Sequence, residues 1–539
     1  MPQRADVVIM GGGLAGLTLA LQLRRRMPHL EIVVLERRAH PVPVAIHKVG
    51  ESSVEIGAHY FGTVLGLESH LRSQQLRKFG FRFFFSDRAQ SLDGVTELGT
   101  SRYLSTPTWQ IDRGLFENHL AQAAAAAGAV FLDDTLIEDF ALDGAPVSVA
   151  GTAHTHQVRY RRGDAEERIC CRWLIDASGR AGLIKERLGL QQANAHDANS
   201  VWFRIGARID VNSWSRDAGW LARCEPPDRW LSTNHLVGEG YWVWLIPLAS
   251  GSHSVGIVAD ARRHPLKSMS SFERALQWLQ AHQPRLAAEL AARRGALQDF
   301  RFLRNFSYGC RQVFSAARWA LTGEAGVFLD PFYSPGSDFI AIGNTYITEL
   351  IERDLRGEPL APHARLYEQL FQSFYRNTLS LYLDQYDIFG DPEVLPVKVF
   401  WDYTYYWGVL CQLFFQNRLA DVAILGRVRG ELAATQALNG AMQRFLREWS
   451  RVGTRRNPAV LIDQAGLDWF VELNRGLRDP LDDAGFEARV RGGCVQLQAL
   501  AAEICERALA RCPHLDAGAV RALLPAGAAG GAMLVSLAA

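Results

Sequence analysis

Three glycines and one glutamate near the start of the chain have the spacing of a dinucleotide-binding turn. The sequence runs Gly11-x-Gly13-x-x-Gly16, and Glu36 follows Gly16 by 20 residues. In such a turn the first glycine allows a tight bend, the second lets a pyrophosphate approach the main chain, and the third permits close packing of helix on strand. A carboxylate at the later position accepts hydrogen bonds from ribose hydroxyls. The motif alone is also compatible with a glycine-rich turn that binds no nucleotide, so its flanking elements matter.

Lys78 is a second candidate for chemistry, because an amine can donate a hydrogen bond or, once desolvated, act as a nucleophile. It lies in the run Leu76–Phe83, between two hydrophobic stretches. Taken alone, such a lysine is more simply interpreted as a solvated surface charge. Trp242 and Trp244 alternate along a predicted strand, and core packing accounts for such a pair without any chemistry.

The elements around the glycine turn are those that a nucleotide site requires. Residues 6–10 predict a strand, the residues after the turn predict a helix to about Met27, and residues 31–35 predict a second strand. Together they form a βαβ unit, which makes the glycine motif much more specific than it is alone. A further helix is predicted over Arg113–Ala127, and a buried strand over Trp173–Ile175.

The pattern changes twice along the rest of the chain. Short, bulky, alternating segments between about 199 and 310 predict an antiparallel sheet, whereas Trp319–Thr322 returns to a core-type strand. The predicted fold is therefore a doubly wound α/β nucleotide-binding domain, an antiparallel β substrate domain and a mainly helical C-terminal region. The predicted boundaries are 1–195 and 311–371 for the nucleotide-binding domain, 196–310 for the β domain, 372–515 for the helical region and 516–539 for a tail.

Composition limits the partners of this protein. The 539-residue chain carries 58 Lys and Arg against 57 Asp and Glu, which offers no bulk charge for nucleic acid or an anionic membrane. No apolar stretch reaches the roughly 18 residues of a membrane span. The eight cysteines have no CxxC spacing, and no metal site is expected. Because the first strand starts about five residues in, we expect no signal peptide and a cytoplasmic location.

Three further segments resemble nucleotide-contact segments of the FAD-dependent aromatic hydroxylase and halogenase superfamily: Gln110–Phe116, Asp176–Arg180 and Gly323–Gly326. The resemblance implies a glutathione-reductase-like domain that binds FAD. One departure is Glu324, because the superfamily usually has an aspartate there that binds the ribityl chain. The cofactor-binding residues that the resemblance and the glycine turn imply are Gly11, Gly13, Leu14, Ala15, Gly16, Glu36, Ser52, Arg113, Asp176, Gly179, Glu324, Pro331 and Gly336.

Two signatures narrow the resemblance to the flavin-dependent halogenases. Trp242–Pro247 fits that family's WxWxIP pattern, and Phe328–Gly336 fits its FxxPxxSxG pattern. Lys78 lies about where the family has its catalytic lysine, downstream of a Gly-Glu-Ser element that here is residues 50–52. The resemblance covers roughly residues 5–370 and implies a tunnel lined by Trp242, Trp244, Ile246, Pro247 and Phe328.

The resemblance implies an enzyme that uses reduced FAD and dioxygen to convert chloride or bromide into hypohalous acid. Lys78 would hold this oxidant, through a hydrogen bond or as a haloamine, and deliver it to an electron-rich aromatic or conjugated substrate, free or bound to a carrier protein. No second dinucleotide motif is evident, so a separate flavin reductase is expected to supply reduced FAD. His47 is interpreted as a wall of the flavin site or a structural residue.

The halide site departs from the family pattern. The resemblance assigns the halide to groups around Ser334, Gly336 and Ser337, at the start of a helix whose dipole favours anions. Pro335 lies among them and has no N–H group to donate. Tyr333 occupies the position where tryptophan-specific members carry a glutamate, which favours a phenol or a carrier-bound pyrrole over free tryptophan.

Two other functions stay open from the sequence. One is a flavin monooxygenase that transfers oxygen without a halide. The other is a non-catalytic flavoprotein of a biosynthetic complex, with Pro335 as a mark of lost activity. The aromatic run Phe400–Trp407 could line a pocket for a flat substrate, although packing between helices explains it more simply.

Overall fold

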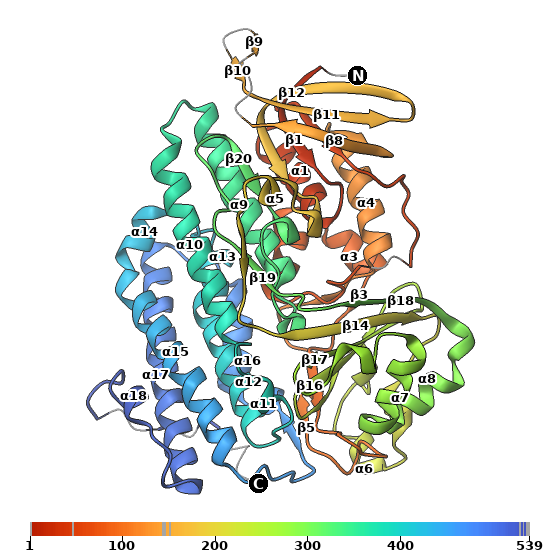
Figure 1. Ribbon diagram of the computed structural model, residues 1–539. Coiled ribbons are helices and arrows are strands. Elements are labelled where there is room, and N and C mark those ends of the chain that lie inside the picture. Colours follow the sequence, from red (N-terminus) through yellow and green to blue (C-terminus); the bar gives the residue numbers. More distant parts are fainter. Residues whose placement is uncertain are drawn as a thin grey trace. The chain divides into compact units, whose positions relative to one another are not determined.

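The structure is a computed structural model that describes residues 3–45, 48–142, 147–149, 152–527, 530–531 and 533–534. It divides into two compact units, each assembled from segments that are far apart in the sequence (Figure 1). Unit 1 consists of Met1–Gln74, Ile111–Asn194 and Ser307–Arg376, and unit 2 consists of Gln75–Gln110, Ala195–Phe306 and Asn377–Ala539.

A seven-stranded sheet forms the centre of unit 1, with the strand order β7-β2-β1-β12-β11-β8 and with β20 paired to β12. The pairs that join β7, β2, β1, β12 and β20 are parallel, so this part of the sheet is doubly wound as predicted. The strands are β1 (Arg4–Met10), β2 (Ile32–Leu35), β7 (Val130–Leu132), β8 (Thr135–Ala141), β11 (His156–Arg162), β12 (Ala165–Asp176) and β20 (Trp319–Leu321).

Three long helices accompany this sheet, and α1 packs against both α4 and α9. They are α1 (Leu14–Arg26), α4 (Arg113–Ala126) and α9 (Gly336–Leu355). The sequence predictions of the βαβ unit and of a helix over Arg113–Ala127 are thus confirmed. The shorter helices of unit 1 are α2 (Glu55–His59), α3 (Glu68–Gln74) and α5 (Leu183–Arg187), and α10 (Leu360–Ser380) leads the chain into unit 2.

Consecutive parallel strands end at the same edge of the sheet, and the loop after each one is tied to the neighbouring strand. The first main-chain N–H group of each loop donates to the last carbonyl group of the next strand in the sheet. These bonds join Glu36 to Leu132 (2.9 Å), Gly11 to Leu35 (2.8 Å), Ala177 to Met10 (2.9 Å) and Thr322 to Asp176 (2.9 Å). The loops after β2, β1, β12 and β20 are therefore fixed side by side, at the edge where doubly wound sheets bind ligands.

An eight-stranded sheet forms the centre of unit 2, in the order β18-β14-β17-β16-β15-β4-β5-β21. Its pairs are antiparallel except β15 with β4 and β5 with β21. The strands are β4 (Phe81–Phe84), β5 (Glu97–Gly99), β14 (Ala198–Ile205), β15 (Thr233–Gly238), β16 (Tyr241–Pro247), β17 (His253–Asp260), β18 (Leu297–Leu303) and β21 (Leu461–Asp463). The antiparallel sheet predicted between about 199 and 310 is confirmed.

The sheet extends beyond the segment that predicted it. Strands β4 and β5 belong to residues 75–110, which the sequence analysis assigned to the nucleotide-binding domain, and β21 belongs to the helical region. All four residues of β4 are buried and pair with β15 along its length. Strand β4 pairs with β15 on one edge and with β5 on the other, so its buried main-chain groups find hydrogen-bond partners within this sheet. The domain boundaries at 195, 310, 371 and 515 stay predictions.

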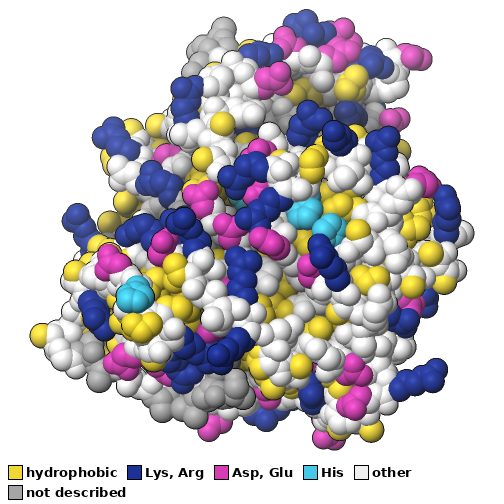
Figure 2. All heavy atoms as spheres, turned by 60° about the horizontal axis from the view of Figure 1, so that its bottom comes forward, with side chains coloured by type: hydrophobic (Ala, Val, Ile, Leu, Met, Phe, Trp, Pro, Cys, Tyr) yellow, Lys and Arg dark blue, Asp and Glu magenta, His cyan; other side chains and the backbone are white. Residues whose placement is uncertain are grey.

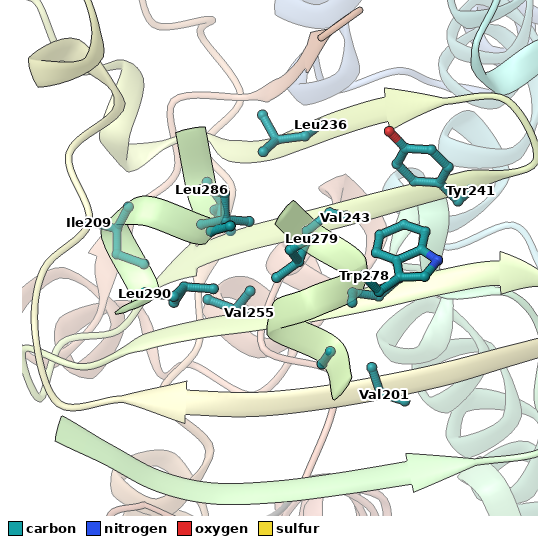
Figure 3. Packing of buried hydrophobic residues seen from close by; sticks show 14 of the residues in the cluster. Val201, Ile209, Leu236, Tyr241, Val243, Val255, Trp278, Leu279, Leu286 and Leu290 are labelled. Carbon is teal, nitrogen blue, oxygen red and sulfur yellow. The ribbon is translucent and has the colours of Figure 1, made fainter. Parts of the chain in front are cut away.

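A hydrophobic core lies between this sheet and two helices, α7 (Phe272–His282) and α8 (Pro284–Ala292). Figure 3 shows Leu279, Leu286 and Leu290 of the helices directed at Val243 and Val255 of the sheet. Alternate residues of β14, β16 and β17 belong to this core, as expected of a sheet with one face on helices.

The C-terminal part of unit 2 is mainly helical, as predicted. Its main helices are α12 (Val394–Tyr405), α15 (Arg429–Val452), α16 (Asp468–Arg475) and α17 (Asp483–Arg511), and α12, α15 and α17 pack against one another. One turn of π-helix, η9 (Tyr406–Leu410), follows α12. It crosses α17 so closely that a Cβ atom on Gly493 would lie 2.8 Å from the carbonyl oxygen of Gly408.

Surface and composition add little that directs partners. Lys and Arg side chains are interspersed with Asp and Glu over the face shown in Figure 2. Each of the eight cysteines is a free thiol. Among the described residues, no helix combines the length and apolar character that crossing a membrane demands, and no cluster of three His, Cys, Asp or Glu side chains could hold a metal ion.

Candidate cofactor site and lysine site

Two glycines of the first turn are required by the packing of unit 1 itself. Gly11 has a φ of +119°, and a Cβ atom there would lie 2.3 Å from the carbonyl oxygen of Ala177. A Cβ atom on Gly16 would lie 2.0 Å from the carbonyl oxygen of Gly11. Neither position leaves room for a side chain, so both glycines are needed to join β1, α1 and β12 whether or not a nucleotide is present.

Gly13 is different, because no protein packing requires it to be a glycine. A Cβ atom there would meet only Lys48 Nζ, at an ordinary contact distance of 3.5 Å. Gly13 is the N-cap of α1, and no side chain caps this end of the helix. The N–H groups of Leu14 and Ala15 therefore open the helix without intrahelical partners, as in helices that bind phosphate. The space at Gly13 and these donors fit a pyrophosphate group.

Glu36 ends β2 beside the same turn. Its Oε2 accepts the N–H of Gly12 at 2.7 Å, and its Oε1 accepts the N–H of Arg38 at 2.9 Å. These bonds hold the carboxylate at the edge of the turn, and each oxygen keeps a second lone pair for a ribose hydroxyl.

A charged cluster of two cations and one carboxylate adjoins Gly13. Lys48 Nζ and Arg113 Nη2 both donate to the fully buried carboxylate of Glu117, the latter at 2.5 Å. Arg113 Nη1 also donates to the carbonyl group of Val49 at 2.5 Å. The cluster has a net charge of +1, which suits an anionic ligand at the open position of Gly13.

The pKa values of this cluster follow from its burial and its pairing. Burial lowers the pKa of Lys48 below its ordinary value, although Glu117 acts in the opposite direction. Burial also acts to raise the pKa of Glu117, but Arg113 and Lys48 together hold it below its ordinary value. Lys48 is not among the residues that the sequence predicts for this site, although a cation two residues before the Gly-Glu-Ser element was the available signal. His47 lies outside the described residues.

The loop after β12 is organised by Asp176. Its Oδ1 accepts the N–H and the hydroxyl of Ser178, at 3.0 and 2.6 Å, and its Oδ2 accepts the N–H of Ile184 at 2.7 Å. Burial raises the pKa of Asp176, and these hydrogen bonds oppose that change. The carboxylate thus shapes its own loop, in which Gly179 has a φ of +66°. Asp176 therefore shapes this loop, and its contact with the cofactor stays a prediction.

Glu324 faces the same loop from the segment after β20. Its Oε2 lies 3.9 Å from Arg180 Nη1, and 34% of its side chain is exposed. Burial of the carboxylate by the surrounding protein raises the pKa of Glu324, and Arg180 opposes this. The guanidinium group of Arg180 lies over the rings of Tyr308 and Phe328, 5.1 Å from each centroid. A partly exposed acceptor is available here, as the ribityl assignment requires.

Of the predicted tunnel residues, Phe328 belongs to unit 1, whereas Trp242, Trp244, Ile246 and Pro247 belong to unit 2.

Ser52 is buried in the segment after Gly50. Gly50 has a φ of +88°, and Arg113 Nη1 would lie 2.9 Å from a Cβ atom there. Arg113 thus packs against the Gly-Glu-Ser element. A main-chain hydrogen bond joins the same two segments, since the N–H of Ile111 donates to the carbonyl group of Glu51 at 2.6 Å.

The predicted halide turn leads into α9. Pro331–Tyr333 form a single 3-10 turn, Ser334 has a φ of +52°, and Pro335 is the N-cap of α9. The N–H of Ser334 donates to the carbonyl group of Pro331 at 2.9 Å. The amide of Ser334 is therefore committed to the turn, and the assignment of Ser334 to the halide site stays a prediction. The first amides of α9 belong to Gly336 and Ser337, and these have no intrahelical partner.

Lys78 lies in unit 2, between the short strand β3 (Leu76–Arg77) and β4. Only 4% of it is exposed, so it is not the solvated charge that an isolated lysine suggested. Its Nζ lies 3.4 Å from the centroid of the Phe81 ring, a cation–π contact. A buried ammonium group beside an aromatic ring is a site that can hold a small polar reagent.

The WxWxIP segment forms β16, and all of its side chains are buried. Trp244 lies against Gly256, where a Cβ atom would be 2.1 Å from the ring, and its Nε1 donates to Ser254 Oγ at 3.1 Å. The centroid of the Trp242 ring lies 5.7 Å from the centroid of the Trp244 ring and 5.2 Å from that of the His235 ring. Core packing is a sufficient explanation for both tryptophans, and Ile246 and Pro247 continue the same buried strand.

The aromatic run 400–407 lies mainly inside the helical region. Phe400, Trp401 and Trp407 are buried, whereas Tyr403 is half-buried. The centroid of the Tyr403 ring lies 6.3 Å from the centroid of the Phe81 ring and 4.6 Å from that of the Trp407 ring. Packing explains most of this run, and Tyr403 connects it to the ring that Lys78 contacts.

Comparison with known proteins identifies the cofactor-binding domain and the relatives of this chain. Residues 4–267 match the family described as FAD binding domain. The chain is 25% identical to flavin-dependent halogenase chlA of Dictyostelium discoideum over 80% of this chain and 76% of the relative. It is 24% identical to a 1H-pyrrole-2-carbonyl-[peptidyl-carrier protein] chlorinase of Pseudomonas fluorescens, over 61% of this chain and 72% of the relative.

The fold matches a solved halogenase along most of its length. The structure of halogenase PltM in complex with phloroglucinol and FAD aligns with a TM-score of 0.64 and 16% identity, over 92% of this chain and 96% of that one. The nucleotide-binding turn, the FAD binding domain match and the halogenase relatives agree with one another. The chain is a flavoprotein with an FAD binding domain, and it is similar to flavin-dependent halogenases.

Proposed function

We propose that this protein halogenates an electron-rich aromatic or conjugated substrate with reduced FAD, dioxygen and chloride or bromide. The bound flavin would supply the oxidation of halide to hypohalous acid. The observation that carries the proposal is the burial of Lys78, with its ammonium group against Phe81, in a chain whose unit 1 has the nucleotide-binding edge. Hypohalous acid reacts unselectively, so the protein must hold it away from water and direct it to one carbon.

Different residues of unit 1 are proposed to bind different parts of FAD. Gly13, Leu14 and Ala15 would receive the pyrophosphate, with the net positive cluster of Lys48, Arg113 and Glu117 beside it. Glu36 would accept from the ribose and Glu324 from the ribityl chain. Gly11, Gly16, Ser52, Asp176, Gly179 and Pro331 are proposed to shape the loops that carry these groups.

The halide is proposed to bind at the start of α9. The amides of Gly336 and Ser337 and the positive end of the helix dipole favour an anion there. Pro335 contributes no donor and Ser334 uses its amide within the turn. Fewer donors favour a large, weakly hydrated anion, and we therefore expect bromide to be used better than chloride.

In unit 2, Lys78 is proposed to bind hypohalous acid and deliver it. Its amine can donate a hydrogen bond to the oxidant or exchange a proton for halogen, with release of water, to form a haloamine. Trp242, Trp244, Ile246 and Pro247 are proposed to wall this part of the route without reacting, in the role that their packing allows. Phe328, a residue of unit 1, stays a predicted tunnel residue.

The substrate class and the partners extend this proposal. One relative is named for a pyrrole held on a peptidyl-carrier protein, and one solved relative holds phloroglucinol. Both are electron-rich rings, which react readily with hypohalous acid. A separate flavin reductase is proposed to deliver reduced FAD. The eight free thiols suit the reducing cytoplasm, which is the proposed location.

Replacing Gly13 tests the assignment of the phosphate site. Gly13→Val fills the space left for pyrophosphate, and overpacking of this kind should raise the FAD dissociation constant by about tenfold or more. Calorimetry measures the affinity, and the melting temperature should change little because the protein offers no clash at this position. Gly16→Val is the matched control, since it collides with Gly11 and should lower the melting temperature instead. Unchanged FAD affinity in Gly13→Val would show that the assignment is wrong.

Replacing Lys48 tests the charge beside that site. Lys48→Met should weaken both FAD and ADP by about tenfold, the size of one charge-assisted contact. Because burial lowers the pKa of Lys48, the wild-type affinity should fall as pH rises through that lowered pKa and the cation is lost, at a lower pH than for an ordinary lysine. ADP carries the pyrophosphate without the flavin, so its dissociation constant isolates this contact.

The control for Lys48 has two parts. Burial lowers the pKa of Lys185 to about 8, so this lysine also loses its charge as pH rises. The slope of FAD and ADP affinity against pH must therefore be compared between wild type and Lys48→Met. Lys267→Met removes an exposed lysine of unit 2 and should leave both affinity and slope unchanged. An equal slope in wild type and Lys48→Met would refute the role of Lys48.

Replacing Lys78 tests the proposed delivery of oxidant. Lys78→Met keeps much of the side-chain volume over Phe81 but removes the amine, so FAD binding and oxygen consumption should persist. Halogenated product should fall by at least about a hundredfold, the low end for loss of a positioned catalytic group. Lys78→Arg should fail nearly as badly, because guanidinium stays protonated and cannot form a haloamine.

Product formation is measured by mass spectrometry with phloroglucinol, bromide and a flavin reductase, in the presence of excess monochlorodimedone, which captures released hypohalous acid before it can react with phloroglucinol in solution. Free hypohalous acid, detected with monochlorodimedone, should rise in both Lys78 variants as product falls. A wild-type yield from Lys78→Met would contradict the proposed mechanism, whereas loss of FAD binding would show that Lys78 maintains the fold.

A further inference from the structure

The turn that carries Lys78 is fastened by its main chain on every residue. The N–H of Lys78 donates to the carbonyl group of Thr108 at 2.9 Å, and the N–H of Phe79 donates to the carbonyl group of Leu231 at 3.1 Å. The carbonyl group of Gly80, which has a φ of +72°, accepts the N–H of Thr233 at 3.1 Å. One group of this turn, the carbonyl of Phe79, is held by a side chain instead of the main chain.

That side chain is Ser232. Its hydroxyl donates to the carbonyl oxygen of Phe79 at 3.0 Å and accepts from Arg82 Nε at 3.3 Å. The N–H of Ser232 donates to the carbonyl group of Arg229 at 3.0 Å. Ser232 is completely buried, so this hydroxyl has no water to replace either partner.

Arg82 and Arg229 are joined to each other by Glu97. Arg82 Nη1 donates to Glu97 Oε1, and Arg229 approaches both carboxylate oxygens, with Nε at 2.8 Å and Nη2 at 3.4 Å. All three side chains are 0% exposed. The ion triad Arg82–Glu97–Arg229 therefore closes a ring of interactions with Ser232.

The surrounding chain makes room for this ring. A Cβ atom on Gly99 would lie 2.9 Å from Arg82 Nη1, so a larger residue would displace the guanidinium group. Arg82 Nη2 donates to the carbonyl group of Thr100 at 2.5 Å, and the Arg229 guanidinium lies 3.9 Å over the Trp220 ring. Three buried charges are an expensive way to stabilise a sheet, because their desolvation offsets most of the attraction between them. Their geometry, in contrast, is rigid.

We propose that Ser232 and the ion triad Arg82–Glu97–Arg229 form a positioning device that fixes the Lys78–Gly80 turn and so directs the Lys78 ammonium group. This inference rests on the proposed role of Lys78 in delivering hypohalous acid. The residues of the ring are positioning residues, since they act through the carbonyl of Phe79 and not on the oxidant. Their loss should increase the escape of oxidant without weakening FAD binding.

The test measures the fate of the oxidant in the full-length protein with FAD, a flavin reductase and bromide. Phloroglucinol and monochlorodimedone are supplied together, and the ratio of brominated phloroglucinol to brominated trap is measured. This capture ratio should fall about tenfold in Ser232→Ala, less than the roughly hundredfold fall expected for Lys78→Met, because a shifted group loses less than a missing one. The capture ratio of Glu97→Gln should fall at least as far as that of Ser232→Ala, and the FAD affinity should be unchanged in both variants.

A second buried ion pair of the same sheet is the matched control. Arg204 Nη1 lies 2.6 Å from Asp299 Oδ2, and both side chains are at most 2% exposed. The pair joins β14 to β18, and β17, β16 and β15 lie between it and β4 in the sheet order. Asp299→Asn should lower the melting temperature, as Glu97→Gln does, but should keep the wild-type capture ratio.

The outcomes separate this inference from the function on which it rests. A low ratio in Ser232→Ala with a normal ratio in Asp299→Asn supports the positioning device. A wild-type ratio in Ser232→Ala, or an equal fall in Asp299→Asn, overturns it while a low ratio in Lys78→Met keeps the proposed function. A wild-type ratio in Lys78→Met overturns both. If Glu97→Gln does not fold, Ser232→Ala alone decides, because it removes one hydroxyl and no charge.

Discussion

The parallel register of β7, β2, β1, β12 and β20 is the constraint on which the cofactor site depends. Each loop that leaves this sheet begins with an N–H group bonded to the last residue of the neighbouring strand, at 2.8 to 2.9 Å. A shift of one strand would therefore move its loop away from the adjacent loops. The tight contacts of Gly11 with Ala177 and of Gly16 with Gly11 lock the same register from the side of α1.

From this register the chemistry of unit 1 follows. The N-terminus of α1, the carboxylate of Glu36 and the loop shaped by Asp176 come together because their strands end at one edge. Lys48 and Arg113 add positive charge at the point where Gly13 leaves space. Unit 2 relies on a different principle, since buried hydrogen bonds and ion pairs determine where the Lys78 turn lies.

The sequence was sufficient for features that depend on neighbours in the chain. The glycine spacing predicts β1, α1 and β2, and the alternating Trp242–Pro247 segment predicts a strand, because both patterns are local. The sequence could not show that β4 pairs with β15, since Phe81 and Thr233 are 152 residues apart. The pairing of Lys48 with Glu117 spans 69 residues and was missed for the same reason.

The sequence does not show which residues also shape their own turns. The Asp176 carboxylate accepts three hydrogen bonds within its own loop. The amide of Ser334, a residue with a φ of +52°, donates to Pro331. The burial of Lys78 could not be read from its neighbours, because it depends on a sheet assembled from three distant segments.

The central proposal is that halogen from oxidised halide, and not oxygen, is transferred to the substrate. It is tested most directly by incubating the protein with FAD, a flavin reductase, phloroglucinol and isotopically labelled dioxygen, with and without bromide. We predict a product with the isotope doublet of bromine and no oxygen label, formed only when bromide is present. An oxygen-labelled product that forms equally well without halide would contradict the account and identify the protein as a monooxygenase.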